Sequence, residues 1–576
     1  MKQSKLMSVL AILTICLAFA FSGCSSSGGS SATENTTAVV HVTATITTPT
    51  TWTHDNVYVI DSSIATSATL TIEPGTIIKF KAGAMLTAGT NGSIIADGQS
   101  ASTPIIFTSI ADDVYGGDTN GDGALTTAAR GDWNYIRVTT SGSAFNHCRF
   151  SYAGAIATGG ALAITNDSTA TVTNCVFAHN QGGTLTDTRA AALNATFAGA
   201  GTVITGNAFY DNDMPLAVNG RYNLDNSNVF HYVVSAGTPT ITNKYNGILF
   251  SGNYSDLTGN ITWSNTDAPY VILRELIVTA GSQLTLGDNV IVKFDTGKSI
   301  DVNGALMADA ETGIVFTSIK DDSVGGDTNG DGAATTPLPG DWLRVQLSAS
   351  GSKLNKCRFS YGGNSSSWGT VTVSNDSTAT ITNCTFAHNK GGTPDDNRGA
   401  ALNIGEAAAG SIVTGNTFYD NDMPLVINAL LDIDNSNVFH MVSNGSTTVT
   451  NKYNGIFMDG VNRRITGSVT WSNTEVPYVI YKYPVWIGTQ YVGASLTLGD
   501  NVVLKFWKTY LAVYDYSTLS QGTGNYFTSL NDDSLRGDTG GDGATTPAQG
   551  DWTGIALYSP TYGYATWGTI LYATIP

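Results

Sequence analysis

An acidic stretch that occurs three times carries the clearest chemistry in this sequence. Its first copy opens with Asp112-Asp113, continues through Asp118-Thr119-Asn120-Gly121-Asp122-Gly123 and closes at Asp132. Alternate carboxylate and amide oxygens at this spacing can converge on one hard divalent cation, and the glycines permit the sharp turn. Five carboxylates crowded into one stretch repel one another unless a cation lies among them. The pattern therefore predicts calcium as a cofactor bound at each copy.

The same oxygen-bearing side chains are retained in all three copies, with one change. In the third copy Gly540 occupies the position of the asparagine, which predicts weaker binding there. The predicted ligands are Asp112, Asp113, Asp118, Asn120, Asp122 and Asp132 in the first copy, Asp321, Asp322, Asp327, Asn329, Asp331 and Asp341 in the second, and Asp532, Asp533, Asp538, Asp542 and Asp551 in the third.

The segment Asp-x-Asn-x-Asp-Gly resembles the first half of an EF-hand calcium loop. The resemblance stops there, because Ala129 occupies the twelfth position, where an EF-hand carries glutamate, and no helix is predicted on either side. It implies a calcium turn of another kind. The alternative is an Asp/Asn/Gly-rich turn without metal. A site present in every copy indicates a structural role more than a catalytic one.

Four cysteines form two equally spaced pairs. Cys148 and Cys175 are 27 residues apart, as are Cys357 and Cys384, and each follows an asparagine by one or two positions. If the two members occupy successive layers of stacked strands, they lie about 4.8 Å apart, somewhat more than the ~3.8 Å between the Cβ atoms of a disulfide. Either a disulfide or a stacked pair of free thiols satisfies this spacing, and the sequence leaves both open.

Other candidate residues point less clearly to chemistry. His179 and His388 are equivalent, as are His231 and His440, and this duplication favours a role at chain corners over catalysis. Asp395-Asp396-Asn397-Arg398 has only a partial counterpart in Asp187-Thr188-Arg189, and we interpret it as a surface turn. The aromatic residues Tyr481, Tyr483, Trp486 and Tyr491 suit sugar binding and core packing equally well. No catalytic residue is predicted.

The N-terminus reads as an export signal. Lys2 and Lys5 precede an apolar core, and small residues then lead to Cys24. This arrangement resembles the bacterial lipoprotein signal, which implies cleavage after residue 23, lipidation of Cys24 and a membrane anchor. The following Ser/Gly-rich residues 24–39 predict a flexible tether. Ser25 resembles the sorting signal for the outer membrane, so we expect an exported protein at the outer membrane or cell surface.

The remainder of the chain consists of one long repeat present two and a half times. Thr51-Trp52 recurs as Thr262-Trp263 and Thr470-Trp471, and Ile78-Lys79-Phe80 recurs as Val292-Lys293-Phe294 and Leu504-Lys505-Phe506. The period of about 210 residues identifies a repeat architecture. We divide the chain into a first repeat (residues 40–259), a second repeat (260–468) and a partial third repeat (469–576).

Within each repeat, short runs of valine, isoleucine, threonine and phenylalanine alternate with Gly, Asn and Asp every 20–30 residues. This is strand chemistry, and no segment keeps a helical period. The segments Asn146–Phe150, Asn174–Asn180 and Asn383–Asn389 resemble those of right-handed parallel β-helix proteins of the pectate-lyase-like superfamily. The resemblance implies an all-β solenoid whose coils bury their inner faces by stacking, with strand partners about 20–32 residues apart. A string of β-sandwich domains is the competing architecture.

Composition narrows the partners and the function. The net charge is −18, or −20 without Lys2 and Lys5, which disfavours nucleic acids. Near-identical repeats favour a non-enzymatic binding, adhesive or scaffolding role, with a polysaccharide or another surface protein as partner. The alternative is a polysaccharide lyase or glycoside hydrolase, although no Gly-His-Gly or Arg-x-Lys element resembling the polygalacturonase set is present. Leu571–Ile575 offers no polar cap, so we expect this end to self-associate or fray.

Overall fold

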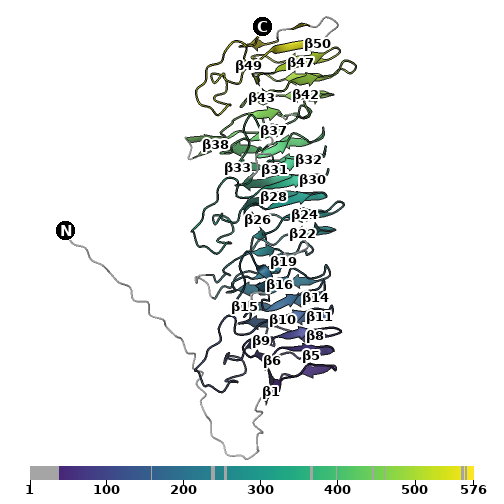
Figure 1. Ribbon diagram of the computed structural model, residues 1–576, viewed down its shortest axis with the longest axis vertical. Helices are drawn as coiled ribbons and strands as arrows, with labels where there is room; N and C mark the ends of the chain where they lie inside the picture. Colours follow the sequence, from purple (N-terminus) through teal and green to yellow (C-terminus); the bar gives the residue numbers. More distant parts are fainter. Residues whose placement is uncertain are drawn as a thin grey trace, which may run out of the picture. The chain divides into compact units, whose positions relative to one another are not determined.

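The computed structural model describes residues 38–156, 159–234, 240–251, 256–363, 368–396, 399–443, 447–458, 461–558, 563–564 and 567–575. The predicted signal, Cys24 and nearly all of the tether lie outside these ranges. Residues Ala38–Pro576 form one compact unit. Within that unit the described strands stack one above another along the direction of the chain (Figure 1).

The predicted all-β fold of stacked parallel strands is confirmed. The described residues contain one short 3-10 helix, η1 (Thr188–Ala190), and every other regular element is a strand. Most strands have three to five residues, because the alternation of apolar residues with Gly and Asn turns allows only short extended runs. Antiparallel pairing between strands is confined, in the described part, to β38–β39 and β50–β51.

Three sheets build the first repeat. A seven-stranded sheet and a six-stranded sheet lie entirely within it, and a third continues beyond it. The seven-stranded sheet contains β1 (Ala38–Val42), β3 (Asn56–Ile60), β6 (Ile77–Phe80), β9 (Ile105–Ser109), β12 (Cys148–Ser151), β15 (Val176–Ala178) and β18 (Ala208–Tyr210). The six-stranded sheet contains β2 (Thr50–Trp52), β5 (Thr69–Ile72), β8 (Ser93–Asp97), β11 (Ser143–Asn146), β14 (Ala170–Thr173) and β17 (Val203–Thr205).

The third sheet passes from the first repeat into the second. Strand β20 pairs with β19 below it and β23 above it, so strands with different places in the two repeats share one sheet. Its members are β4 (Ile64–Thr66), β7 (Leu86–Ala88), β10 (Ile136–Val138), β13 (Leu162–Ile164), β16 (Leu193–Ala195), β19 (Leu216–Val218), β20 (Ile248–Phe250), β22 (Asn260–Trp263), β23 (Tyr270–Ile272), β25 (Gln283–Leu286), β26 (Ile291–Phe294), β28 (Ala305–Ser318), β30 (Ser352–Ser360), β32 (Ala379–Thr382), β33 (Thr385–Ala387), β35 (Ile412–Thr414) and β36 (Thr417–Tyr419).

A twelve-stranded sheet passes in the same way from the second repeat into the third, through the pairing of β40 with β37 and β43. It contains β21 (Asp256–Leu257), β24 (Leu276–Val278), β27 (Ser299–Val302), β29 (Arg344–Leu347), β31 (Val371–Val373), β34 (Leu402–Ile404), β37 (Leu425–Ile427), β40 (Ile456–Met458), β43 (Tyr478–Tyr481), β46 (Val503–Trp507), β49 (Tyr526–Ser529) and β52 (Thr569–Ile570). The remaining strands are β38 (His440–Ser443), β39 (Thr447–Thr450), β41 (Arg464–Ile465), β42 (Ser468–Trp471), β44 (Val485–Ile487), β45 (Ser495–Leu498), β47 (Tyr510–Tyr514), β48 (Thr518–Gln521), β50 (Gly554–Tyr558) and β51 (Gly563–Tyr564).

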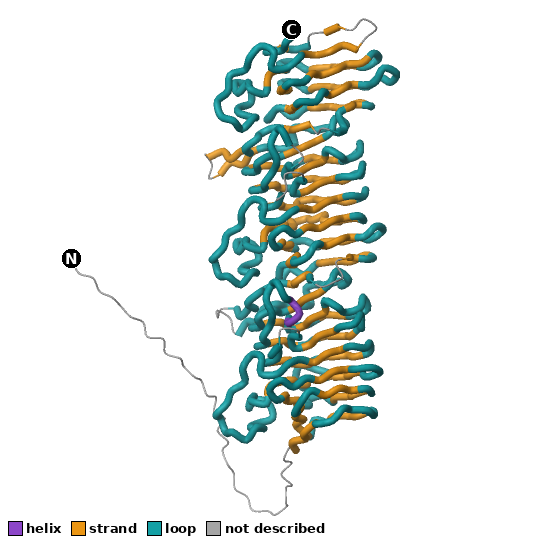
Figure 2. Tube along the Cα trace, in the orientation of Figure 1, coloured by secondary structure: helices purple, strands orange, loops and turns teal. Residues whose placement is uncertain are grey.

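Most strand partners have the predicted separation, but the layers that carry the acidic loops do not. Phe150 pairs with Phe177, 27 residues on, whereas Leu86 pairs with Ile136, 50 residues on. The longer separation arises because the first acidic loop is inserted between β9 and β10 without adding a layer to the stack. Loops at the corresponding positions follow β28 and β49, and Figure 2 shows all three as long teal segments beside the strands.

Aromatic and asparagine side chains hold successive layers in register. The rings of Phe359, Phe386 and Phe418 stack at centroid distances of 5.2 and 5.0 Å, and all three are fully buried. At the corners, buried asparagines hydrogen-bond to one another: Asn421 Nδ2 donates to Asn451 Oδ1 at 2.8 Å. Such ladders satisfy the buried polar groups of each corner by contact with the next layer.

Candidate metal centre

The second acidic loop brings three predicted ligands together. One carboxylate oxygen from each of Asp322, Asp327 and Asp331 lies within 4.8 Å of the others, and no other such group of acidic, histidine or cysteine side chains occurs in the described ranges. Burial and the charges of the other two carboxylates raise the pKa of Asp322. A divalent cation at this point would remove that repulsion.

Several carboxylate oxygens in these loops are buried without a hydrogen-bond partner. They are Oδ1 of Asp322 and Asp331, and the same atom recurs at Asp113 and Asp122 in the first loop and at Asp533 in the third. An unpaired buried oxygen costs free energy unless something binds it. Hard oxygen ligands of this kind suit calcium, which takes about 6–8 of them, so the residues present fit the predicted ion.

Local backbone chemistry shapes the turn that carries these oxygens. Oδ1 of Asp327 accepts from the backbone N–H of Gly330 at 2.7 Å, and Oδ2 accepts from that of Gly332 at 2.8 Å. The two glycines have φ values of +71° and +77°, a region in which other residues are strained. Asn329 Nδ2 then donates to Asp331 Oδ2 at 2.9 Å and fixes its carboxylate. The first loop repeats these contacts through Asp118, Asn120 and Asp122.

The third loop differs at the position where asparagine is absent. Asp538 still accepts from the N–H groups of Gly541 and Gly543, at 2.6 and 2.9 Å, so the turn itself is conserved. Gly540, however, has no amide to hold Asp542. The third loop therefore keeps the shape of the first two with a less constrained carboxylate.

The other predicted ligands clamp the ends of the loops. Asp321 Oδ2 accepts from Thr317 Oγ1 at 2.7 Å, and Asp341 Oδ2 accepts from Ser318 Oγ at 2.8 Å. Equivalent bonds join Thr108 to Asp112, Ser109 to Asp132, Thr528 to Asp532 and Ser529 to Asp551. These six aspartates thus tie both ends of each loop to the strand before it, while the remaining ligands gather at the turn.

A buried lysine beneath each loop was missed by the sequence analysis. Lys79, Lys293 and Lys505 are fully buried, and their Nζ atoms donate to the carbonyl oxygens of glycines in the loops at 2.6–2.8 Å. Burial lowers the pKa of Lys293 and Lys505 to about 8, against the opposing effect of the nearby aspartates. The available signal was a charged residue between two apolar ones, Ile-Lys-Phe or its equivalent, in all three repeats.

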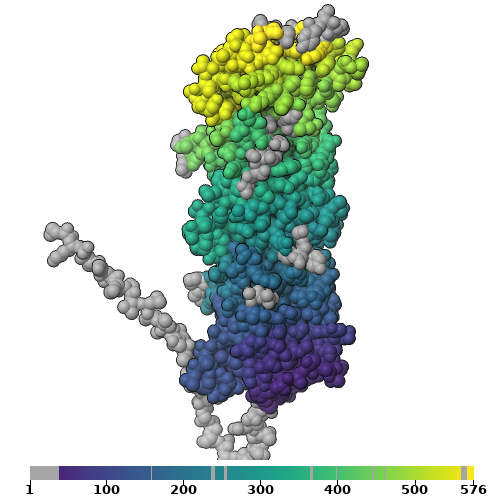
Figure 3. Space-filling view, in the orientation of Figure 1, coloured from purple at the N-terminus to yellow at the C-terminus, as the bar shows by residue number. Residues whose placement is uncertain are grey.

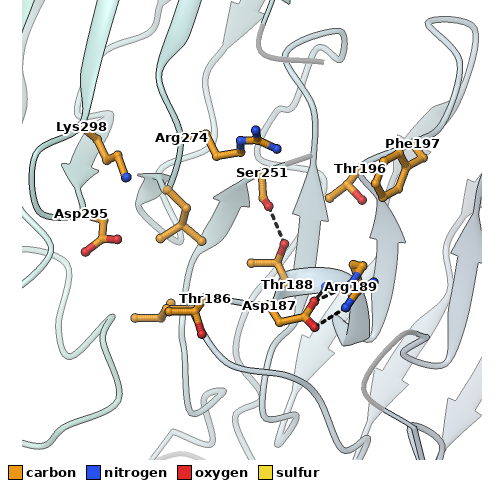
Figure 4. Close-up of a pocket in the computed structure, with 12 residues that line it drawn as sticks. Thr186, Asp187, Thr188, Arg189, Thr196, Phe197, Ser251, Arg274, Asp295 and Lys298 are labelled. Carbon is orange, nitrogen blue, oxygen red and sulfur yellow. Dashed lines mark hydrogen bonds and ion pairs between the residues drawn. The ribbon is translucent and has the colours of Figure 1, made fainter. Parts of the chain in front are cut away.

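A polar cleft of about 580 Å³ lies where the first and second repeats meet (Figure 4). Its lining includes Asp187, Arg189, Arg274, Asp295 and Lys298, three cationic side chains against two acidic ones. Asp187 caps η1 and forms a double ion pair with Arg189 at 2.8 and 2.7 Å. The Arg189 hydrogen bonds lower the pKa of Asp187, so this carboxylate stays ionised and is poorly suited to act as a general acid.

Beside this cleft, Glu275 and Asp301 form a carboxyl pair that sequence reasoning also missed. Their side-chain hydrogen bond, together with burial, raises the pKa of Glu275. Arg344 pairs with Asp301 at 3.2 Å. The first repeat has Ser63 and Thr87 at the equivalent positions, so the pair belongs to one repeat alone.

The duplicated histidines occupy layer corners, in line with their predicted role. His179 Nδ1 lies 2.5 Å from Asp211 Oδ2, and His388 Nδ1 lies 2.6 Å from Asp420 Oδ2. The ring of His179 also stacks on Tyr152 at 5.5 Å. These are interlayer contacts of the same kind as the asparagine ladders.

The four cysteines are free, buried thiols in the structure. Cys148 and Cys175 sit in adjacent layers, and each Sγ contacts a backbone carbonyl oxygen, that of Ala96 at 3.4 Å and of Thr173 at 3.2 Å. Burial raises the pKa of the Cys148 and Cys357 thiols. Both effects suppress the reactive thiolate.

We therefore expect the thiols to be unreactive in the native protein. With Cys16 and Cys24 replaced by serine, fewer than about one of the four remaining thiols should react with Ellman's reagent before unfolding, and all four in guanidinium chloride. Fast native reaction would contradict the burial. No reaction even after unfolding would mean that the pairs are disulfides.

No family model, curated protein or solved structure matches this chain. In the described ranges, no helix is long and apolar enough to cross a membrane.

Proposed function

We propose that the protein is a surface-anchored lipoprotein whose exported part is a calcium-stabilised, right-handed parallel β-helix with a non-enzymatic binding, adhesive or scaffolding role. The observation that carries the calcium proposal is the set of buried, unpaired aspartate oxygens at matching positions in the acidic loops. Each loop emerges directly from the stacked strands, so an ion bound there ties the loop to the stack. The space-filling view presents the repeats as successive colour bands, a surface that suits a long, linear partner (Figure 3).

The calcium proposal is tested by titration calorimetry on the calcium-free protein. We expect two tighter sites, in the first and second loops, and one weaker site in the third, where Gly540 replaces asparagine. Asp322→Asn should remove one tight site because it lowers the charge of the converging group. Absence of binding heat at millimolar calcium would overturn the proposal.

The anchor is proposed from the sequence around Cys24. Lipidation there would keep the protein in the outer-membrane fraction of the cell. Replacement by alanine, Cys24→Ala, should release it into the soluble fraction while Cys16→Ala leaves its membrane association unchanged. Equal fractionation of the two variants would count against the anchor.

The binding role is tested with purified protein and a panel of immobilised polysaccharides. In the cleft of Figure 4, Asp187 is held ionised by Arg189, an arrangement that favours binding over acid catalysis. We expect retention on at least one polysaccharide without new reducing ends or unsaturated products. Reproducible cleavage would replace the binding role with an enzymatic one.

One observation favours a polysaccharide lyase or glycoside hydrolase as the second candidate. Glu275 and Asp301 share a hydrogen bond beside the cleft, and the raised pKa of Glu275 is the condition a general acid needs. Their absence from the first repeat is what a single catalytic site predicts. If cleavage is found, Glu275→Gln should abolish it and Ser63→Ala, at the matching position, should not.

A further inference from the structure

A second pocket, of about 400 Å³, lies where the second repeat meets the third. Its walls come from a turn of the second repeat, from the ends of β43 and β46, and from the third acidic loop. The side chains that matter for its chemistry are Asp395, Tyr481, Trp507, Asn531 and Asp542, with the buried Leu530 also in the lining. Its volume falls in the range of about 300–1,000 Å³ typical of small-molecule sites.

Two aromatic side chains adjoin each other in this pocket. Tyr481 and Trp507 are register partners on β43 and β46, and both are partly buried against the core cluster that contains Leu530. Their rings therefore have one side supported by protein and belong to the wall of the pocket.

The fold does not require aromatic residues at these two positions. The second repeat has Leu273 and Asp295 there, and the first has Asp61 and Lys81, which form an ion pair at 2.6 Å. An ion pair, an aliphatic residue beside an acid, and an aromatic pair all leave the strands intact. The aromatic pair is therefore a feature of this pocket alone and calls for a reason other than packing.

Asp395 is held in a fixed, ionised state at the edge of the aromatic pair. Tyr481 Oη donates to its Oδ1 at 2.8 Å, and Lys482 forms an ion pair with the same atom. The hydrogen bonds from Lys482 and Tyr481 lower the pKa of Asp395. The corresponding position in the first repeat, Thr186, carries no charge.

We propose that this pocket binds a neutral sugar ring of a polysaccharide. The electron-rich faces of Tyr481 and Trp507 attract the partly positive C–H groups on one face of a pyranose. The ionised Asp395 accepts hydrogen bonds from the sugar hydroxyls, which are stronger than those to a neutral acceptor. A uronic acid is disfavoured, because Asp395 and Asp542 both line the pocket and would repel its carboxylate.

This inference rests on the proposed binding function and names the class of ligand. The probes are hexasaccharides of glucose, mannose and xylose, with an oligogalacturonate as the anionic comparison, and the readouts are calorimetry and tryptophan fluorescence of the full chain in calcium. We expect at least one neutral oligosaccharide to bind and the oligogalacturonate not to bind at this pocket.

Trp507→Ala should weaken that binding roughly tenfold or more, as loss of a central aromatic contact does, and Asp395→Asn should weaken it less. Leu273→Ala, at the position matching Tyr481, is the control and should leave it unchanged. If Trp507→Ala lowers the melting temperature, Trp507→Phe, which keeps an aromatic face, should restore much of the binding.

Failure of all the neutral oligosaccharides to bind, or equal binding by wild type and Trp507→Ala, would overturn the inference. Calcium titration without sugar is independent of this pocket. A protein that binds calcium but no sugar therefore refutes the pocket alone, and one that binds neither refutes the calcium proposal as well.

Discussion

Millimolar calcium is expected to raise the melting temperature of the protein by several degrees over its value in EDTA. A ligand that binds only the native state stabilises it by RT ln(1 + [L]/Kd), about 2.7 kcal/mol per site at one hundred times Kd. The two loops with an asparagine ligand together contribute about 5 kcal/mol on that basis, and the third contributes less. The measurement is thermal unfolding followed by circular dichroism in both buffers.

Single substitutions separate the loops. Asp122→Ala and Asp331→Ala should each remove part of the calcium-dependent shift, because each deletes a carboxylate with a buried, unpaired oxygen. Asp542→Ala should remove less, since its loop lacks the asparagine that fixes this carboxylate in the other two. Asp55→Ala, at an exposed position outside the loops, controls for the loss of one negative charge. Identical melting curves with and without calcium would return the loops to plain turns.

Replacing Asn421 by alanine is expected to destabilise the protein by about 3–4 kcal/mol, because it leaves several buried polar groups unpaired at about 1–3 kcal/mol each. Asn421 is 2% exposed, and its Oδ1 accepts from the backbone N–H and from Nδ2 of Asn389 at 3.1 and 2.9 Å. Its Nδ2 donates to Asn451 Oδ1 and to the carbonyl oxygen of Phe386. Urea denaturation in calcium measures the change in the free energy of unfolding.

The matched variants show whether the effect belongs to the buried ladder. Asn212→Ala, at the equivalent corner of the first repeat, should cost about as much, because the ladder of Asn180, Asn212 and Asn243 makes the same contacts. Asn435→Ala should cost less than about 1 kcal/mol, since this exposed side chain bonds to Thr474 where water can replace it. An equal loss for Asn421→Ala and Asn435→Ala would show that the interlayer bonds add nothing beyond a surface hydrogen bond.

Local pattern was sufficient to predict the class of fold. Alternating β-branched residues, broken by Asn and Gly, predict short strands, and equal spacing of similar segments predicts that they stack in parallel. Phe150, Phe177 and Phe209 do lie in successive layers, 27 and 32 residues apart. The spacing failed only where a loop is inserted, because a loop lengthens the chain between two layers without changing their distance.

The candidate calcium residues were identified correctly as neighbours, but their separate roles were not. Sequence spacing places Asp321, Asp322 and Asp341 in one loop and gives all three the same chemistry. The hydrogen bonds of Thr317 and Ser318 separate them, because a carboxylate that ties the loop to a strand has its oxygens engaged. The buried Lys293 escaped notice because burial of a charge depends on what the loop places above it.

By itself the sequence determined the repeat, the strand chemistry, the acidic turns and the export signal, since each depends on residues close together in the chain or on direct self-comparison. Only the tertiary structure decided what lies between repeats. It placed β20 between β19 and β23, so that a sheet of the first repeat becomes a sheet of the second. It also brought Asp395 to Tyr481, 86 residues away. Such contacts depend on how the layers stack, and no local pattern encodes the angle at which one repeat follows another.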